Sequence, residues 1–281
     1  MRKEYALYSY SLYYTIILHL RRNIVIIYNL KMWPDNLTKS AAQPPVSILT
    51  PTYNRRQFLP RLYSYILAQE YPVERMEWVI LDDGTDSVED LVAGFRAEGK
   101  GRLEIQYVRV SEKLTIGAKR NRLHDLARGE ILVNMDDDDY YMPVRVSHAV
   151  ISLRSKNAQL AGSSRNHLYF TDDGSIWSVG PYMQNHATFG TMAYTKRFAK
   201  THRCDETKLY AEEVEFTNRY TEPLVQLDPM KVMLVLCHSN NTFDKRDLRT
   251  NDSGQIRKTG LALKNFLHKA ADRAFYTDLR S

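Results

Sequence analysis

Short apolar runs alternate with amphipathic segments four times between residues 44 and 155. Each apolar run has the length and composition of a strand that is buried on both faces. The strands are expected at residues 46–49, 78–81, 103–110 and 131–135. Each is followed by apolar residues at helical spacing, within residues 59–66, 88–95, 116–127 and 146–153. This alternation predicts an α/β fold with a mostly parallel central sheet flanked by helices.

The pattern changes after about residue 160. Residues 159–170 and 175–179 read as a hairpin around an Asp-Asp-Gly turn, residues 212–220 as a short helix, and residues 232–237 as a buried strand. This half is expected to be a smaller α+β region. The predicted boundaries are 44–143 for the first half, 144–245 for the second, and 246–281 for a basic tail with an amphipathic helix over 255–276.

Residues 1–43 differ from the rest. An uncharged run of sixteen residues, Tyr5 to Leu20, is followed by Arg21-Arg22 and a second apolar run. A membrane-spanning helix needs about twenty apolar residues, so this run is too short. One interpretation is an interfacial helix that gives peripheral membrane contact. The alternatives are a helix packed on the protein body and a dispensable extension.

Charge and cysteine content narrow the partners. The formal net charge of +6 is modest and spread along the chain, which suits phosphorylated small molecules or an anionic membrane and does not indicate nucleic acid. Cys204 and Cys237 form no CxxC pair. The chain therefore has no disulfide framework or zinc motif, and a cytoplasmic location, with or without membrane association, is expected.

Polar residues gather where predicted strands end. Thr52 to Arg55 follow the first strand, Asp82-Asp83 the second, and four consecutive aspartates, Asp136 to Asp139, the fourth. Ligands of open α/β sheets bind at the carboxyl ends of the strands. Four adjacent carboxylates repel each other unless a cation such as Mg²⁺ or Mn²⁺ lies among them. A solvated acidic turn is the alternative interpretation.

Four motifs occur in a specific order along the chain. They are Pro51-Thr-Tyr-Asn-Arg55, Val79-Ile-Leu-Asp-Asp-Gly-Thr-Asp86, Gly117-Ala-Lys-Arg-Asn121 and Met135-Asp-Asp-Asp-Asp139. Together they resemble the signatures of family 2 glycosyltransferases over about residues 45–245. The resemblance implies the GT-A fold, a Rossmann-like fold of nucleotide-diphospho-sugar transferases. It also implies a nucleotide-sugar donor and a divalent metal, Mn²⁺ or Mg²⁺.

Donor contacts follow from the side chains and from the resemblance. The Tyr53 ring can stack on a base, and Asp83 can accept a hydrogen bond from a base N–H such as that of uracil. Lys119 and Arg120 can offset diphosphate charge, although a solvated basic face is the alternative. The expected donor-binding residues are Thr52, Tyr53, Arg55, Asp83, Lys119, Arg120, Asp136 and Asp137.

The resemblance also assigns metal and catalytic residues. Asp138 is expected to bind the metal, and His238 to complete the metal shell, while Asp139 is expected to cap the following helix. Glu212 and Glu213 resemble the acidic pair of the acceptor site. Glu213 falls at the position of the catalytic base, with Glu in place of the more usual Asp.

These features predict a metal-dependent inverting glycosyltransferase that moves a sugar, most simply from a UDP-sugar, to a hydroxyl of a glycan, lipid or other acceptor. Trp177, Tyr182 and Gly190–Met192 are expected to line the sugar or acceptor pocket. A sugar nucleotidyltransferase is the rival enzyme, but it would need a Gly-rich basic loop after the first strand. A non-catalytic nucleotide-sugar or carbohydrate-binding module is the third hypothesis.

Overall fold

The computed structural model describes residues 7–10, 13–20, 23–26, 43–99, 101–238, 241, 245–250 and 254–279. The chain forms two compact units, Met1–Gln43 and Pro44–Ser281. Among the described residues, every helix is too short or too polar to cross a membrane.

The first unit contains strands where a helix was expected. They are β1 (Leu7–Tyr10), β2 (Tyr13–Leu20) and β3 (Asn23–Ile26), which pair in the antiparallel order β1-β2-β3. The helical interpretation is therefore wrong for these residues. The segment is rich in Tyr and Ile, which favour extended backbone. The other residues of the predicted extension up to position 42 lie outside the described part.

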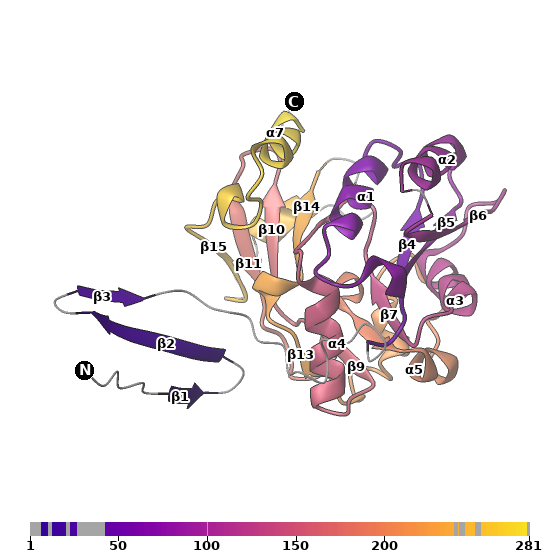
Figure 1. The fold of residues 1–281 in the computed structure, drawn as a ribbon. Coiled ribbons are helices and arrows are strands. Elements are labelled where there is room, and N and C mark those ends of the chain that lie inside the picture. Colours follow the sequence, from indigo (N-terminus) through magenta and orange to yellow (C-terminus); the bar gives the residue numbers. More distant parts are fainter. Residues whose placement is uncertain are drawn as a thin grey trace. The chain divides into compact units, whose positions relative to one another are not determined.

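The second unit is built on a seven-stranded sheet with the order β13-β9-β12-β7-β4-β5-β6 (Figure 1). Neighbouring strands from β7 to β6 run parallel, as predicted, whereas β12 is antiparallel to β7 and β9. The parallel strands are β4 (Val46–Thr52), β5 (Met76–Asp82), β6 (Glu104–Arg109) and β7 (Ile131–Asn134). The others are β9 (Leu160–Gly162), β12 (Ala193–Thr195) and β13 (Val225–Gln226).

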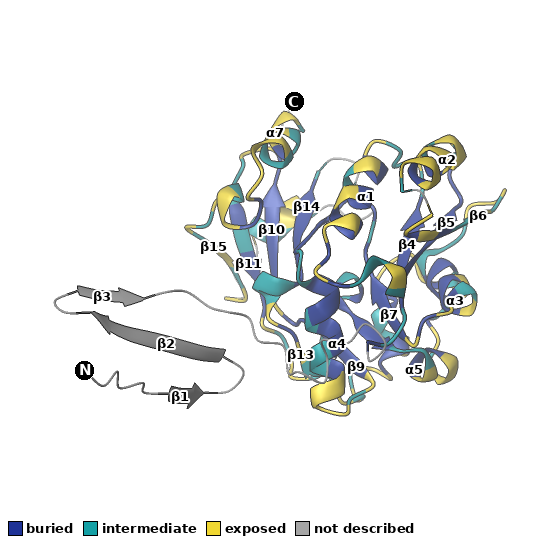
Figure 2. Ribbon diagram, in the orientation of Figure 1, coloured by how far each residue is buried: buried dark blue, intermediate teal, exposed yellow. Residues whose placement is uncertain are grey.

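Helices cover both faces of this sheet. Ile48 packs in one core cluster with Leu62 of α1 and Val92 of α2, whereas its neighbour Leu49 packs in another with Leu123 of α3. Successive strand residues point to opposite faces, so both faces are buried, and Figure 2 shows the strands dark blue between partly exposed helices. The helices are α1 (Leu59–Leu67), α2 (Glu89–Glu98), α3 (Ile116–Leu126), α4 (Arg145–Ser155), α5 (Lys196–Thr201) and α6 (Glu213–Phe216).

A second sheet of five strands has the order β15-β11-β10-β14-β8. Its strands are β8 (Tyr140–Tyr141), β10 (Asn166–Phe170), β11 (Ile176–Val179), β14 (Met233–Cys237) and β15 (Ile256–Lys258). β10 and β11 form the predicted hairpin, with Asn166 opposite Val179. Single turns of 3-10 helix occur at Val73–Arg75, Phe189–Thr191, Pro229–Lys231, Arg246–Thr250 and Leu263–Asn265.

The predicted helix over residues 255–276 is wrong for residues 255–269. β15 pairs with β11 at the sheet edge, and only α7 (Ala270–Asp278) is α-helical. A local amphipathic pattern does not reveal that a distant strand offers an open edge. Phe266 and Tyr276 are nevertheless buried, in a cluster with Phe58, Tyr65 and Tyr140. This end of the chain therefore contributes to the core.

Candidate active site

The end of β4 brings two predicted donor-site residues to the acidic run. Thr52 Oγ1 donates a hydrogen bond of 2.7 Å to Asp137 Oδ2. The Arg55 guanidinium lies 3.5 Å from Asp137 Oδ1 and also pairs with Asp138. Between them, Asn54 adopts a φ of 53°, a left-handed conformation that asparagine tolerates. This turn directs the chain from the strand toward the aspartates.

The two aspartates that end β5 have different surroundings. Asp82 is fully buried and accepts hydrogen bonds of 2.8 Å from the Tyr107 hydroxyl and 3.0 Å from Arg109. It therefore holds the strand end together. The next loop packs tightly: a Cβ on Gly84 would lie 2.7 Å from the Asn54 nitrogen. Only glycine allows the loops after β4 and β5 to approach so closely.

Asp83, in contrast, lies with the other predicted nucleotide-binding residues. Its carboxylate pairs with Lys119 Nζ at 2.6 Å and accepts a hydrogen bond of 2.7 Å from the Leu114 backbone N–H. Lys119 Nζ also lies 5.6 Å from the centre of the Tyr53 ring, and Lys113 Nζ lies 4.3 Å from it. An aromatic ring, a carboxylate and two ammonium groups thus gather at one place. Such a set suits a nucleotide.

Arg120 joins the acidic run to the predicted acceptor residues. Its Nη1 and Nη2 contact the two Asp136 carboxylate oxygens at 2.6 and 3.1 Å, and its Nε lies 3.3 Å from Glu212. The guanidinium carbon also lies 4.6 Å from the centre of the Phe189 ring. Arg120 is only 3% exposed, and its positive charge is paired with these two acids. From the sequence, Arg120 was instead predicted to offset the charge of a diphosphate.

Asp138 lies next to the other predicted metal ligand. Its Oδ2 is 3.0 Å from His238 Nε2 and accepts a hydrogen bond of 3.0 Å from Asn241. Within the described part of the chain, no group of three or more His, Cys, Asp or Glu side chains could hold a metal ion. Mg²⁺ and similar ions often use one or two protein ligands, with phosphate oxygens and water as the rest. A carboxylate and an imidazole side by side fit that arrangement.

Asp139 does not cap the following helix, so this expectation is wrong. It accepts a hydrogen bond of 2.8 Å from the backbone N–H of Leu236, which belongs to β14. The partner lies almost a hundred residues further along the chain, and no local pattern indicates it. Asp139 therefore ties the end of the acidic run to the second sheet.

The buried aspartates differ in ionisation. Burial, reinforced by the Asp138 charge, raises the pKa of Asp137 to about 7 and that of Asp139 well above its ordinary value. Burial acts in the same direction on Asp138, but the His238 hydrogen bond and the Arg55 charge outweigh it and hold its pKa below the ordinary value. Asp138 is therefore the strongest candidate here for a cation ligand.

Glu213 begins α6 in a different environment. Among the described residues, no side chain forms an ion pair or hydrogen bond with its carboxylate. Burial, with the neighbouring Glu212 charge, raises the pKa of Glu213 to about 7. A carboxylate with this pKa can accept a proton near neutral pH. The predicted helix over residues 212–220 is short, because Asn218, Arg219 and Tyr220 all adopt left-handed conformations.

Comparison with protein families decides the identity of this fold. The model of "Glycosyl transferase family 2" matches residues 47–214, more than half of the chain. The chain belongs to glycosyl transferase family 2. The matched range includes the motifs after β4, β5 and β7 and ends just after Glu213.

Several curated relatives in this family align with part of the chain. WcaA of Escherichia coli, named for colanic acid biosynthesis, is 36% identical over 104 residues, which cover 37% of this chain and 36% of WcaA. TuaG of Bacillus subtilis, named for teichuronic acid biosynthesis, is 29% identical over 98 residues, covering 34% of this chain and 37% of TuaG. The matched segment thus spans about a third of the length of each relative.

Solved structures share the fold. The mannosyltransferase PcManGT from Pyrobaculum calidifontis, solved with GDP-Man and Mn²⁺, has a TM-score of 0.58 and 17% identity; the match covers 76% of this chain and 63% of that chain. Residues 1–349 of S. aureus TarS, solved with UDP-GlcNAc, match with a TM-score of 0.55 and 17% identity. This match covers 70% of this chain and 60% of that chain. The predicted GT-A fold is confirmed.

Some site features were not recognised as such in the sequence. Gly190 lies against the acidic run, where a Cβ would be 3.1 Å from Asp136 Oδ2. Arg145, which is fully buried, donates hydrogen bonds of 2.8 Å to the carbonyl oxygens of Thr191 and Met192, just after this glycine. The Gly190–Met192 segment was predicted at the pocket, but the sequence indicates neither the close approach of Gly190 to Asp136 nor the part of Arg145 in holding this segment.

Trp177 and Tyr182, which were both predicted to line the sugar or acceptor pocket, lie in different surroundings. Trp177 packs on Phe170 in the second sheet, with 6.5 Å between ring centres, and its Nε1 donates a hydrogen bond to Ser175. These contacts are structural. Tyr182 instead lies beside His186, with 4.6 Å between ring centres.

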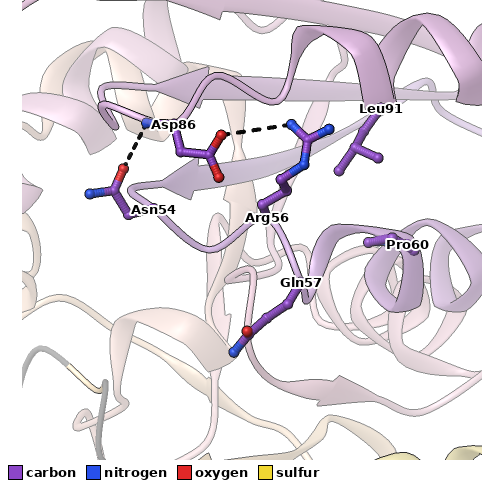
Figure 3. Close-up of a pocket in the computed structure, with 6 residues that line it drawn as sticks. All are labelled: Asn54, Arg56, Gln57, Pro60, Asp86 and Leu91. Atoms are coloured by element: carbon purple, nitrogen blue, oxygen red, sulfur yellow. Dashed lines mark hydrogen bonds and ion pairs between the residues drawn. The ribbon is translucent and has the colours of Figure 1, made fainter.

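A surface hollow shown in Figure 3 lies on the other side of the loop after β4. Arg56 contributes to it and pairs there with Asp86 at 3.9 Å and with Asp90, whereas the preceding Arg55 contacts the acidic run. Neighbouring arginines thus serve different surfaces. The lining residues are Asn54, Arg56, Gln57, Pro60, Asp86 and Leu91.

Proposed function

We propose that this chain is a metal-dependent inverting glycosyltransferase that moves a sugar from a nucleoside diphosphate sugar to an acceptor hydroxyl. The main support is Glu213, a carboxylate with a pKa of about 7 and no described side-chain partner. It lies next to Glu212, which Arg120 connects to Asp136 of the acidic run. A proton acceptor is thus linked to the proposed donor site through one buried arginine.

In the proposed donor site, the base stacks on Tyr53 and donates an N–H to Asp83. The Asp83 carboxylate has about four lone-pair sites, so its bonds with Lys119 and Leu114 leave capacity for a base. A uracil N–H would suit this acceptor. UDP is therefore the proposed nucleotide, in agreement with the UDP-GlcNAc in the TarS structure.

Asp138 and His238 are the proposed metal ligands, and Arg55 lies on the same carboxylate. When bound, Mn²⁺ or Mg²⁺ would neutralise charge on the diphosphate as the nucleotide leaves. Asp136 and Asp137 are proposed to face the ribose or the transferred sugar. Thr52 holds Asp137 in place.

Catalysis is proposed to be a single displacement. Glu213 takes the proton of an acceptor hydroxyl, and the hydroxyl oxygen forms a bond to the anomeric carbon while the bond to the diphosphate oxygen breaks. One displacement inverts the configuration at that carbon. Glu212, which Arg120 holds in place, is proposed to position Glu213, and the negative charge of Glu212 helps to keep the pKa of Glu213 high.

We place the protein in the cytoplasm, in agreement with two buried free cysteines, Cys204 and Cys237. The acceptor is proposed to be a glycan, a lipid or another molecule with a free hydroxyl. Peripheral membrane contact through residues 1–43 stays a prediction, since most of that segment lies outside the described residues.

Calorimetric titration with UDP-, GDP- and dTDP-sugars, with and without Mn²⁺, tests the donor site. Binding is expected to be strongest for a UDP-sugar and to tighten with Mn²⁺. Asp138→Asn should remove most of the Mn²⁺ effect, whereas the control Asp86→Asn, at an exposed aspartate, should keep it. Absence of metal-dependent binding to all three donors would refute the proposal.

A further inference from the structure

Three partly exposed aromatic rings form a cluster near the proposed base. The Tyr182 and His186 rings lie 4.6 Å apart, and the His186 and Tyr220 rings lie 4.7 Å apart, with interplanar angles of 50° and 33°. Burial lowers the pKa of His186 below its ordinary value, so its ring is neutral at pH 7. The cluster is therefore an uncharged aromatic surface.

The loop that contains two of these rings is held in place by one side chain. Gln226 Nε2 donates hydrogen bonds of 2.6 and 2.9 Å to the carbonyl oxygens of Gln184 and His186. Gln226 Oε1 accepts a hydrogen bond of 2.9 Å from the Ser164 backbone N–H. Because Gln226 belongs to β13, the loop is attached to the edge of the main sheet.

The third ring is attached to the helix of the proposed base. Thr217 Oγ1 donates to the Glu213 carbonyl oxygen at 2.7 Å and accepts a hydrogen bond of 3.1 Å from the Tyr220 backbone N–H. Tyr220 has a φ of 61°, and the two residues before it are also left-handed. Such strained backbone is kept when surrounding contacts require it, often at functional sites.

The charges of the acidic pair also act on Tyr220. Burial, with the Glu213 and Glu212 charges, raises the pKa of the Tyr220 hydroxyl to about 12. Tyr220 therefore lies within electrostatic range of the carboxylate that is proposed to deprotonate the acceptor.

We propose that Tyr182, His186 and Tyr220 form an acceptor subsite that packs against the apolar face of a sugar ring. The acceptor is thus a glycan with a pyranose at the end that is extended. This inference rests on the proposed glycosyl transfer. One face of a pyranose presents mainly C–H groups, which pack favourably on the electron-rich faces of aromatic rings.

A sugar fits this surface better than a lipid tail. Each of the three rings combines an apolar face with a polar edge, and two carboxylates lie nearby. A pyranose has the same division between C–H groups and hydroxyls, whereas an alkyl chain would leave the polar edges without partners. The donor base has its own aromatic partner in Tyr53, at the end of β4.

Saturation-transfer NMR with methyl glycosides of glucose, galactose, mannose and N-acetylglucosamine tests the subsite on the full chain with UDP and the diamagnetic ion Mg²⁺. At least one glycoside is expected to bind, with saturation strongest on the C–H protons of one ring face. Tyr220→Ala and Tyr182→Ala, on different elements, should each weaken binding about two- to tenfold, the range for one aromatic contact. Tyr220→Phe should keep it.

Leu67→Ala, which removes an exposed apolar side chain from α1, is the control and should bind like the wild type. UDP affinity is measured separately for each protein, so failure of the proposed donor site can be distinguished from failure of the aromatic subsite. If UDP binds but no glycoside does, the subsite is refuted. It is refuted equally if both alanine variants bind glycosides like the wild type, or if only an alkyl-phosphate probe binds and the alanine variants weaken that probe.

Discussion

The proposed donor site and the proposed acceptor site place their carboxylates in different surroundings. At the proposed donor site, Asp83 pairs with Lys119 and Asp138 pairs with Arg55. At the proposed acceptor site, Glu212 forms an ion pair with Arg120, but Glu213 has no such partner among the described residues. Among the described residues, the acid next to the proposed base is thus paired with a cation, whereas the proposed base is not.

This difference separates binding from proton transfer. An acid paired with a cation is held in place and accepts hydrogen bonds, which suits recognition of a ligand. An acid that is partly buried and has no cationic partner, as Glu213 is among the described residues, has a raised pKa and can exchange a proton near neutral pH. Glu212, which precedes α6, and Glu213, the first residue of α6, are therefore proposed to have different roles because their surroundings differ.

The first way to break this comparison is to remove the proposed base. Glu213→Gln should lower the transfer rate about 10²- to 10⁴-fold, the usual contribution of general base catalysis, with unchanged donor affinity. The measurement is nucleotide release from the donor identified by calorimetry. The control Glu215→Gln, at an exposed residue of the same helix, should keep the wild-type rate. A Glu213→Gln enzyme with full turnover would remove Glu213 as the base.

The second test removes Arg120, the arginine that connects the proposed donor and acceptor sites. Arg120→Met leaves the buried Glu212 and the partly exposed Asp136 without a cation, which should cost about 3–5 kcal/mol in the free energy of unfolding. Urea denaturation measures it. Arg122→Met, on the same helix at a 46% exposed side chain that pairs loosely with Glu112, should cost less than about 1 kcal/mol. Equal losses for both variants would show that Arg120 is not a buried bridge.

The third and smallest effect concerns backbone strain next to Glu212. Ala211 has a φ of 58°, which costs a residue with a Cβ about 1–2 kcal/mol. Ala211→Gly should therefore stabilise the protein by about 1 kcal/mol in the same urea measurement. Ala93→Gly, at an exposed position within α2, should destabilise it by about 0.5–1 kcal/mol. Destabilisation by both would contradict the strain.

Local sequence predicted the sheet because its parallel strands are buried on both faces. Val46–Thr52 and Met76–Asp82 are continuous buried runs, and such runs stand out between amphipathic helices. The same logic placed Asp83 and Asp138 at one edge of the sheet, since the carboxyl ends of parallel strands meet there. The structure brings Thr52, Arg55, Asp137 and Asp138 together as expected.

Long-range partners were not predictable. Asp139 accepts a hydrogen bond from the backbone of Leu236, and β15 pairs with β11. In both cases the partner is distant in the chain. Arg120 was recognised as a functional cation, but its bridge to Glu212 depends on how α3 and α6 pack. The short length of α6 depends on left-handed residues that composition does not indicate.

The dependence of the rate on pH tests the central claim most directly. Nucleotide release from the preferred donor, at saturating Mn²⁺, is measured from about pH 5.5 to 8.5 in wild-type protein. Since the pKa of Glu213 is raised to about 7, the carboxyl is protonated and inactive below that pH. The rate should therefore rise through pH 7 and level off above it. A rate that is already constant from the acid end would contradict the role of Glu213 as the base.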